Sequence, residues 1–357
     1  MTDLLSMTKP ELEELMEQLG EKRFVAAQLF SWLHKQRVVS FDEMTNLSKA
    51  LRDKLKKNYN ISSCTIAKKL VSVYDDTVKY LFTLHDGEQI ESVVMKYKYG
   101  YTICVSSQVG CKMGCTFCAS GIAGFVRHLL PGEILAQVYT AARDLDVRIS
   151  HIVMMGVGEP LDNFDNVLRF LQLITNENGY DLSMRNISLS TCGIVPGIYR
   201  LMEQKLQLTL SVSLHAPNDA IRSRTMPVNR RWPIEELLKA CRAYTKQTGR
   251  RISFEYALIA GVNDSDACAL ELAHRLQGML CHVNLIPVNS VKERSYTRSD
   301  TARIKQFMHV LETRHINATV RRTLGSDINA SCGQLRRGEG PGSDNTNELM
   351  NLAQYKR

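Results

Sequence analysis

The 357-residue sequence contains no run of about 18 uninterrupted apolar residues, the length that a membrane-spanning helix requires. Its opening stretch, MTDLLSMTKPELEELMEQLG, also lacks a basic region followed by an apolar one, which is the pattern of a secretion signal. We therefore expect a cytoplasmic protein without a membrane partner. Because 44% of the residues are hydrophobic, we also expect a large core, formed by one big domain with a smaller attachment.

The sequence lacks a paired cysteine framework as well. In a cytosolic chain its ten cysteines would meet reductants, so disulfide bonds are not expected to hold the fold together. Structural zinc sites use four ligands, usually as two separated pairs, and the sequence has no such two-pair motif. Three cysteines nevertheless lie close together, at Cys111, Cys115 and Cys118. A function has to be found for three thiols rather than four.

Acidic residues are in the minority, with 37 Asp and Glu against 45 Lys and Arg, which gives a formal net charge of +8. The excess is concentrated between residues 22 and 57, where nine basic residues stand against three acidic ones. Apolar residues three and four apart predict short helices there. A solvated helix surface explains most charge runs of this kind, so this segment indicates either a solvent-facing helical unit or a nucleic-acid contact.

The rest of the chain has the pattern of an α/β fold. Extended runs between residues 66 and 105, separated by turn-like YDDT and HDGE, predict antiparallel strands. Beyond them, six β-branched runs alternate with amphipathic stretches, which predicts parallel strands with helical crossovers. Six strands are too few for a closed eight-stranded barrel, so we predict a partial barrel. The six runs are YTICVSSQ, SHIVMMG, RNISLSTC, QLTLSVSLH, RISFEYALIAG and CHVNLIPVN.

Polar residues gather where these predicted strands end. In barrels of this kind, ligands bind at the carboxyl ends of the strands. The first run ends in the cysteine loop and the second in glycine-rich MMGVGEP, where backbone can approach a ligand closely. Loops are often polar for solvation alone, but a joint position facing the cysteine loop favours a ligand site. The strand-end residues are Gly156, Gly158, Glu159, Ser190, Thr191, Ser213, His215 and Asn289.

Three thiolates can hold a cubane iron–sulfur cluster and leave one iron open, and an open iron can bind and activate a small molecule. Gly110 and Gly114 suit such a site because glycine lets the backbone wrap around the cluster. The alternatives are a redox Cys-x-x-Cys motif with a bystander cysteine, and plain core thiols.

The string CKMGCTFC resembles the signature of the radical S-adenosylmethionine (SAM) superfamily. The longer strings CVSSQVGCKMGCTFCASG, MGVGEPLDN, SLHAPND and SDINASCGQLR resemble the RlmN/Cfr family of RNA adenosine methyltransferases. The resemblance runs from SWLHKQRVVSFDEMTNLSKALRDKL to about residue 337. It implies a partial (β/α)6 radical-SAM barrel with accessory segments. The expected divisions are a basic helical RNA-binding domain at 1–60, a β extension at 61–100, the barrel at 101–322, and a C-terminal loop and tail at 323–357.

The resemblance implies that Cys111, Cys115 and Cys118 hold a [4Fe–4S] cluster whose fourth iron chelates SAM. One electron, from a donor such as flavodoxin or ferredoxin, would cleave SAM to methionine and a 5′-deoxyadenosyl radical, and each turnover would use two SAM molecules. The family's SAM contacts correspond to Gly158, Glu159, Ser190, Ser213, Leu214, His215 and Asn289, most of which the strand-end argument also selects.

The resemblance also implies three catalytic residues. Cys332 would take a methyl group from one SAM, and the radical made from a second SAM would remove hydrogen from that methyl so that the resulting methylene adds to adenine. Cys104 would release the RNA by forming a disulfide with Cys332. Glu91 would accept the proton of adenine C2, provided that it is held nearby and partly desolvated. By themselves, Cys332 would be a core thiol and Glu91 a strand-edge carboxylate. The remaining cysteines are expected to be packing residues: Cys64, Cys192, Cys241, Cys268 and Cys281.

The family has two types. The RlmN type methylates adenine C2 in the peptidyl-transferase region of 23S rRNA, and often C2 of the adenosine 3′ of the anticodon in tRNA; the Cfr type methylates C8 of the same rRNA adenosine. Pro160 and the basic N-terminal helices resemble the RlmN type, while Val157, Asn329 and Ser331 depart from common family strings. We expect a monomer whose RNA binding weakens steeply with salt, with phosphate contacts from the basic helices and from VNRRW, TGRRIS, VRRTLG and QLRRG.

Two other classes of function stay open at this point. One is a radical-SAM enzyme that acts on a protein or a small molecule, for which the basic helices would be incidental. The other is a zinc-stabilised RNA-binding protein without catalysis.

Overall fold

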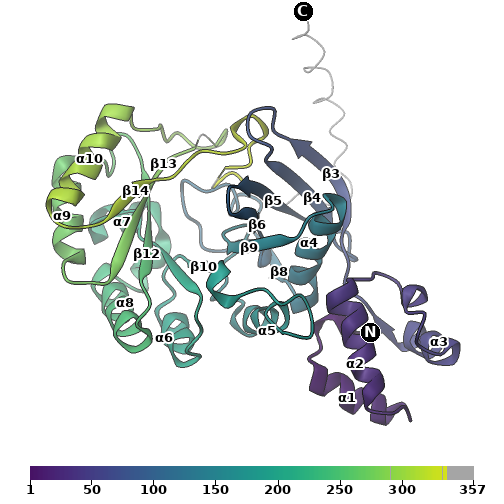
Figure 1. Ribbon diagram of the computed structural model, residues 1–357. Helices are drawn as coiled ribbons and strands as arrows, with labels where there is room; N and C mark the ends of the chain where they lie inside the picture. The colour runs from purple at the N-terminus through teal and green to yellow at the C-terminus, as the bar shows by residue number, and fades with distance from the viewer. Residues whose placement is uncertain (290, 332, 336–357) are drawn as a thin grey trace, which may run out of the picture.

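The structure, a computed structural model, describes residues 1–289, 291–331 and 333–335 (Figure 1). Its centre is a ten-stranded sheet in the order β14-β13-β12-β11-β10-β9-β6-β5-β4-β3. The seven strands from β6 to β14 run parallel, and β5, β4 and β3 continue the sheet antiparallel. These strands are β3 Thr65–Val71, β4 Val78–Thr83, β5 Gln89–Tyr97, β6 Gly100–Cys104, β9 Ile149–Met154, β10 Ile187–Thr191, β11 Thr209–Ser213, β12 Ile252–Leu258, β13 Cys281–Pro287 and β14 Ala318–Val320.

The predicted α/β fold with a partial barrel is confirmed, and the six predicted runs are β6 and β9 to β13. The structure adds β14 as a seventh parallel strand, paired with β13 at Val283↔Ala318. Three residues are too few for a visible period, so the sequence pattern did not reveal this strand. The antiparallel strands expected before the barrel are hydrogen-bonded into the same sheet through β5 and β6.

Helices cover the outer face of the curved sheet, and the inner face is left for the site (Figure 1). The crossover helices carry an apolar side that packs into one continuous core, which extends from Leu4 to Ile316. The helices of this part are α4 Pro131–Asp144, α5 Phe164–Ile174, α6 Val195–Glu203, α7 Asp219–Thr225, α8 Ile234–Thr248, α9 Asp266–Leu276 and α10 Thr301–Thr313, with short 3-10 turns η4 Met184–Asn186, η5 Pro227–Arg230 and η6 Ser326–Ile328.

The N-terminal segment forms a small helical unit beside the barrel. At the start of its helix α1 the carboxylate of Glu11 accepts the backbone amide of Thr8 at 2.6 Å and the hydroxyl of Thr8 at 2.8 Å. His34 is fully buried and its Nδ1 lies 3.1 Å from the hydroxyl of Tyr139 in α4, so the unit is anchored to the barrel. The elements are β1 Thr2–Asp3, η1 Leu4–Ser6, α1 Lys9–Gln18, α2 Phe24–Ser31, the π-helical turn η2 Trp32–Gln36, η3 Phe41–Glu43, α3 Lys49–Asn58 and β2 Tyr59–Asn60.

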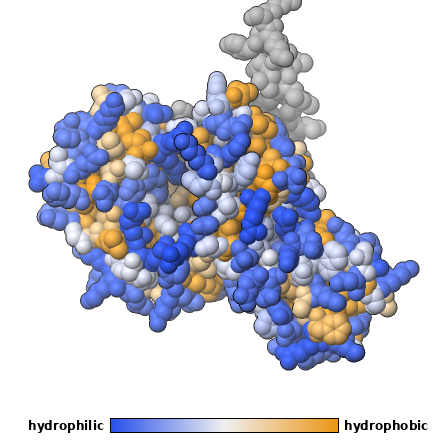
Figure 2. All heavy atoms as spheres, viewed as in Figure 1, coloured by the Kyte–Doolittle hydropathy of each residue, from blue (hydrophilic) through white to orange (hydrophobic). Residues whose placement is uncertain are grey.

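The surface of the face in view is largely hydrophilic, with scattered apolar groups (Figure 2). Among the described residues, none of the helices has the length and hydrophobicity that crossing a bilayer requires.

Candidate active site

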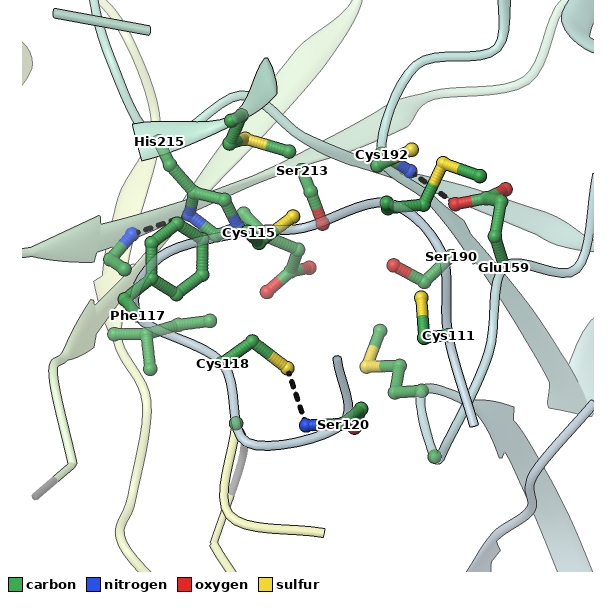
Figure 3. A pocket seen from close by; sticks show the side chains of 18 of the residues that line it. Cys111, Cys115, Phe117, Cys118, Ser120, Glu159, Ser190, Cys192, Ser213 and His215 are labelled. Carbon is green, nitrogen blue, oxygen red and sulfur yellow. Dashed lines mark hydrogen bonds between the residues drawn. The ribbon is translucent and has the colours of Figure 1, made fainter. Parts of the chain in front are cut away.

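A cavity opens at the carboxyl ends of the parallel strands, and Figure 3 shows the three thiols of the cysteine loop around it. Ser190 and Ser213, at the ends of β10 and β11, line the same cavity, and in Figure 3 they lie close to Cys111 and Cys115. The sequence-predicted residues that line it are Cys111, Cys115, Cys118, Gly156, Gly158, Glu159, Ser190, Ser213, His215 and Asn289. Of the strand-end residues, Thr191 is buried and does not line it.

Leu214 is the exception among the expected SAM contacts. Its side chain is fully buried and does not line the cavity. Its backbone instead ties β11 to neighbouring segments, because the amide donates to the carbonyl of Glu255 and the carbonyl accepts from Arg222. Any contact of Leu214 with a ligand in this cavity would therefore involve the backbone.

The cysteine loop is folded by backbone hydrogen bonds and by two glycines. It follows the short hairpin strand β7 Gln108–Gly110, which pairs with β8 Phe125–His128. Gly110 and Gly114 have φ angles of +75° and +69°, in the left-handed region that favours glycine. A Cβ atom on Gly110 would lie 1.8 Å from the carbonyl oxygen of Gly124, so this position has no room for a side chain.

The donor set of the loop fits an iron–sulfur cluster better than a single metal ion. Among the described residues, no three His, Cys, Asp or Glu side chains are grouped closely enough to hold one ion. Cys111, Cys115 and Cys118 instead surround a shared cavity, as thiolates on separate corners of a cluster would. The amide of Ser120 donates to Cys118 Sγ at 3.4 Å, which is the kind of contact that tunes cluster thiolates.

Burial controls the chemistry of these thiols. Desolvation raises the pKa of Cys111 to about 12 and also raises that of Cys115, where the other loop thiols add to the effect. Cys111 and Cys115 therefore have to lose a proton as iron binds, since the thiolate is the ligand form.

Glu159 forms part of the cavity wall beside Cys192. Its two carboxylate oxygens accept the backbone amides of Leu161 at 3.0 Å and Cys192 at 2.7 Å. Burial of this side chain raises the pKa of the carboxyl group. The side chains of Thr191 and Cys192 also hydrogen-bond to this carboxyl group. A carboxylate in this wall is a suitable partner for the ammonium group of an amino-acid ligand.

The glycines before Glu159 serve the fold more directly than a ligand. A Cβ on Gly156 would lie 2.7 Å from the carbonyl carbon of Val105, and one on Gly158 would lie 2.7 Å from Gln108 Cβ. The close approach that the glycine-rich string predicts is thus an approach of the loop after β9 to the chain after β6. Both glycines nevertheless also line the cavity.

His215 is held neutral and in one tautomer. Its backbone has a positive φ of 54°, and its Nδ1 accepts the amide of Ala257 at 2.8 Å, so the proton of the neutral ring is on Nε2. Burial, with a smaller effect from the Arg222 charge, lowers the pKa of His215 to about 3. Phe117 of the cysteine loop packs against the ring in a T-shaped contact with centroids 4.8 Å apart.

Cys192 and Arg222 are among the residues in and around the site that were not selected from the sequence. Cys192, expected to be a packing residue, lines the cavity beside Glu159. Arg222 in α7 is fully buried, and its guanidinium donates to the carbonyls of Cys192, Ser213 and Leu214, which fixes the ends of β10 and β11. Its positive charge also opposes the rise in the pKa of Cys115. In the sequence, Arg222 is only one arginine closely following SLHAPND, and its pattern is that of an ordinary helix-surface residue.

Cys104 and Glu91 lie on the inner face of the sheet next to this cavity. Cys104 ends β6 directly opposite Val93 of β5, and Glu91 lies two residues before Val93 on the same face. Glu91 forms a salt bridge with Lys79 of β4 at 2.7 Å, and both side chains are largely buried. Cys104 belongs to a small apolar cluster with Val93, Val157, Ala330 and Leu335.

Cys332 lies outside the described residues, but the segments on both sides of it are described. The carbonyl of Gly333 accepts the amide of Ala119 at 2.8 Å, and that of Leu335 accepts the hydroxyl of Ser120 at 2.7 Å. Gly333 lines the cavity of the three thiols, and Ser331 lines a neighbouring cavity together with Cys104. The C-terminal segment therefore spans the cysteine loop and Cys104.

Family models match two parts of the chain. Residues 2–61 match the ribosomal RNA large subunit methyltransferase N-terminal domain of RlmN, and residues 105–273 match the radical SAM superfamily. The chain is 54% identical over 335 residues to the "Probable dual-specificity RNA methyltransferase RlmN" of Alkaliphilus oremlandii, covering 94% of this chain and 97% of the relative. The protein of the same name from Clostridium novyi is 52% identical over 337 residues, covering 94% and 98%.

The chain belongs to the RlmN family. This confirms the resemblance drawn from the sequence and makes the protein a radical SAM methyltransferase. A crystal structure of a radical SAM methyltransferase from Sphaerobacter thermophilus agrees with its fold, with a TM-score of 0.91 and 46% identity over 94% of this chain and 99% of that one. RlmN-family membership implies SAM and a [4Fe–4S] cluster as ligands, which the thiols and polar strand ends of this cavity fit.

Proposed function

We propose that this protein methylates C2 of an adenosine in the peptidyl-transferase region of 23S rRNA, and C2 of the adenosine 3′ of the anticodon in tRNA. The observation that carries the proposal is the position of the described segments around residue 332. They contact the cysteine loop on one side and the apolar cluster around Cys104 on the other, which supports a role for this segment between the SAM cavity and a resolving cysteine. RNA as the substrate comes from the names of the RlmN relatives.

In this proposal Cys111, Cys115 and Cys118 hold the cluster, and Glu159, Ser190, Ser213, His215 and Asn289 bind SAM. The cluster, when bound, supplies the single electron that splits SAM into methionine and a 5′-deoxyadenosyl radical. The carboxylate of Glu159 orients the amino group of SAM, and the serine hydroxyls and the amide of Asn289 bind its polar edges. The neutral imidazole of His215 can donate only through Nε2, since Nδ1 is already used by Ala257.

Cys332 would carry the methyl group. Its thiolate takes methyl from a first SAM, and a second SAM provides the radical that removes hydrogen from this methyl, so that the carbon can bond to adenine C2. The covalent protein–RNA adduct first carries an unpaired electron, which the cluster, oxidised when SAM is split, would take back. Glu91 then removes the C2 proton, a role for which its buried position near Cys104 is suitable.

Cys104 would release the product. Its thiolate attacks the sulfur of Cys332, and the sulfur–sulfur bond forms as the sulfur–carbon bond breaks. The electron pair of the broken bond stays on the carbon attached to the base, which takes up a proton and becomes the methyl group. An external dithiol reductant then reduces the disulfide by thiol–disulfide exchange, which restores both thiols.

The test uses unmodified 23S rRNA and tRNA, SAM labelled in its methyl group, and flavodoxin as the electron donor, under anaerobic conditions. We expect wild-type protein to produce 2-methyladenosine, Cys332→Ala to produce none, and Cys104→Ala to accumulate a covalent protein–RNA adduct. Cys241→Ala is the matched control, because Cys241 is a buried core thiol outside the cavity.

Three results would contradict the proposal in different parts. Methylated RNA from Cys332→Ala would exclude the methyl-cysteine route. A product of 8-methyladenosine would show the Cfr type of regiochemistry, and an unmodified RNA pool with intact SAM cleavage would indicate a substrate other than RNA.

A further inference from the structure

A stacked pair of tyrosines lies where β5 joins β6, outside the site described above. Tyr97 ends β5 and Tyr99 lies in the turn before β6. Their ring centroids are 5.0 Å apart and their planes differ by 7°, while His151 makes a T-shaped contact with Tyr99 at 4.7 Å. Tyr99 is still 61% exposed. The ring of Tyr99 is therefore held in one orientation and is open to solvent.

Neither burial nor turn chemistry explains this tyrosine. Tight turns between antiparallel strands favour glycine, asparagine and aspartate, whereas this turn has Lys98 and Tyr99. A side chain with most of its surface in water contributes little to the core. A flat, oriented and exposed ring is instead what proteins use to stack against an unpaired nucleic-acid base.

The pair is connected to the proposed catalytic thiol along one face of β5. Val93 is opposite Cys104 and Tyr97 is opposite Gly100, so four residues of strand separate the two positions. Residues at every second position share a face, and the rise of about 3.3 Å per residue gives a separation of roughly 13 Å. One cavity is lined by Val93, Tyr97 and Cys104 together. The tyrosines are thus in reach of nucleotides next to a base held at Cys104.

A second cavity, of about 270 Å³, lies directly beside the pair. It is lined by both tyrosines and by side chains with hydrogen-bonding groups suited to base edges and ribose hydroxyls. The exposed Lys98 in the turn adds a positive charge for a phosphate group. The polar lining favours a nucleotide over the apolar anchor of a protein partner. Its polar residues include Thr102, Ser211, Arg251, Ser253, His282 and Asn284.

We propose that Tyr97 and Tyr99 form a stacking platform for an RNA base that neighbours the methylated adenosine. An adenosine modified at a ring carbon has to leave its stack, which leaves its neighbour without a stacking partner, and the platform supplies one. The inference rests on the proposed function, because it requires RNA as the substrate.

The experiment uses the full-length protein and a synthetic RNA stem–loop with an unpaired adenosine, flanked on its 5′ or 3′ side by the fluorescent base 2-aminopurine. We compare Tyr99→Ala with Tyr99→Phe, which keeps the ring, and with Tyr74→Ala as a matched control. Tyr74 lies in the turn after β3 and is 76% exposed. Binding affinity, 2-aminopurine fluorescence and RNA methylation are measured for each protein, together with methylation of the protein by SAM without RNA.

We expect one of the two labelled stem–loops to be quenched by wild-type protein and by Tyr99→Phe. Tyr99→Ala should lose the quenching and bind RNA about tenfold more weakly, a loss within the range of one base–aromatic stack. Its methylation without RNA should equal that of wild type, which shows that the fold and SAM site are intact. Tyr74→Ala should resemble wild type in every measurement.

Equal binding and quenching by Tyr99→Ala and Tyr74→Ala, with RNA still methylated by wild type, would overturn the platform and leave the proposed function standing. If wild-type protein methylated itself but no RNA, the proposed function and the platform would both be wrong.

Discussion

The ammonium group of Lys79 bridges Glu91 and the C-terminal segment. It lies 2.7 Å from a carboxylate oxygen of Glu91 and donates to the carbonyl of Asn329 at 3.1 Å. Two parts of the chain that are far apart in sequence are thus joined at one cation, with both charged side chains no more than 13% exposed. The proposed base and the segment that leads to Cys332 share this anchor.

We predict that Lys79→Ala destabilises the protein and slows product release. Removing one partner of a largely buried ion pair leaves the other charge unpaired, which costs about 3 kcal/mol of unfolding free energy. The proposed base Glu91 also loses its orientation, so we expect the protein–RNA adduct to be resolved about tenfold more slowly. This is part of the roughly 10²- to 10⁴-fold rate enhancement that a general base contributes. Denaturant titration and gel analysis of trapped adduct measure the two effects.

Lys69→Ala is the matched control for this change. Lys69 lies on the neighbouring strand and pairs with Asp144 at 2.6 Å, but both side chains are about a third exposed or slightly less. An exposed pair contributes at most about 1 kcal/mol, so this variant should be nearly as stable as wild type. Adduct that clears at the wild-type rate in Lys79→Ala would contradict the anchoring role.

We predict that Gly110→Ala prevents cluster assembly whereas Gly124→Ala does not. Both residues have positive φ angles, of +75° and +72°, so both changes introduce backbone strain of about 1 kcal/mol. Only at Gly110 would the new Cβ also collide with another backbone atom, since Gly124 has nothing within 4 Å of that position. Iron and sulfide content after anaerobic reconstitution measures the difference; equal content in the two variants would show that the loop tolerates the collision.

The sequence was most informative where chemistry follows strand ends. The cysteine spacing and the polar residues after each β-branched run indicated a common rim, because parallel strands place their carboxyl ends at the same edge. Ser190, Ser213 and His215 could therefore be selected from the sequence alone. Their side chains line one cavity with the three thiols.

Interactions between distant segments could not be predicted in this way. The burial of Arg222 depends on carbonyls supplied by two different strand ends, and one arginine in a helical pattern carries no sign of that. The inward position of Cys192 depends on the register of β10 against its neighbours. The glycine-rich string correctly predicted that the backbone approaches another group closely. It did not predict that this group is the protein's own chain after β6 rather than a ligand.

We predict that His34 makes the protein less stable in mild acid. Burial lowers the pKa of His34 from 6.5 to about 3, and the side chain contacts the hydroxyl of Tyr139 on one nitrogen. The unfolded chain therefore binds the proton first as the pH falls. The contribution of neutral His34 to the free energy of unfolding is fully present above the ordinary pKa of 6.5 and is lost progressively as the pH falls toward 3. At pH ~5 the loss amounts to about 2 kcal/mol.

Denaturant unfolding of wild type and His34→Gln at several pH values measures this contribution. The difference in unfolding free energy between the two should shrink by about 2 kcal/mol from pH ~8 to pH ~5, because glutamine does not titrate. His85→Gln is the control, since the side chain of His85 is 69% exposed. A constant difference across this range would mean that His34 does not titrate on unfolding.

We predict that α3 contributes to the salt dependence of RNA binding. Its apolar residues Leu51 and Leu55 pack inward, which leaves Lys49 and Lys57 exposed on the opposite side of the helix. Each lysine that contacts a phosphate releases a counterion, so the slope of log K against log salt changes by about 0.7 to 0.9 per contact. Replacing both by alanine, which favours helix, should reduce the slope by up to twice that amount without unfolding α3.

Lys246→Ala, on the surface of α8, should leave the slope unchanged. If the double α3 variant keeps the wild-type slope, the basic charge of this unit is a solvated surface and RNA is held elsewhere, most directly by the arginines around the barrel.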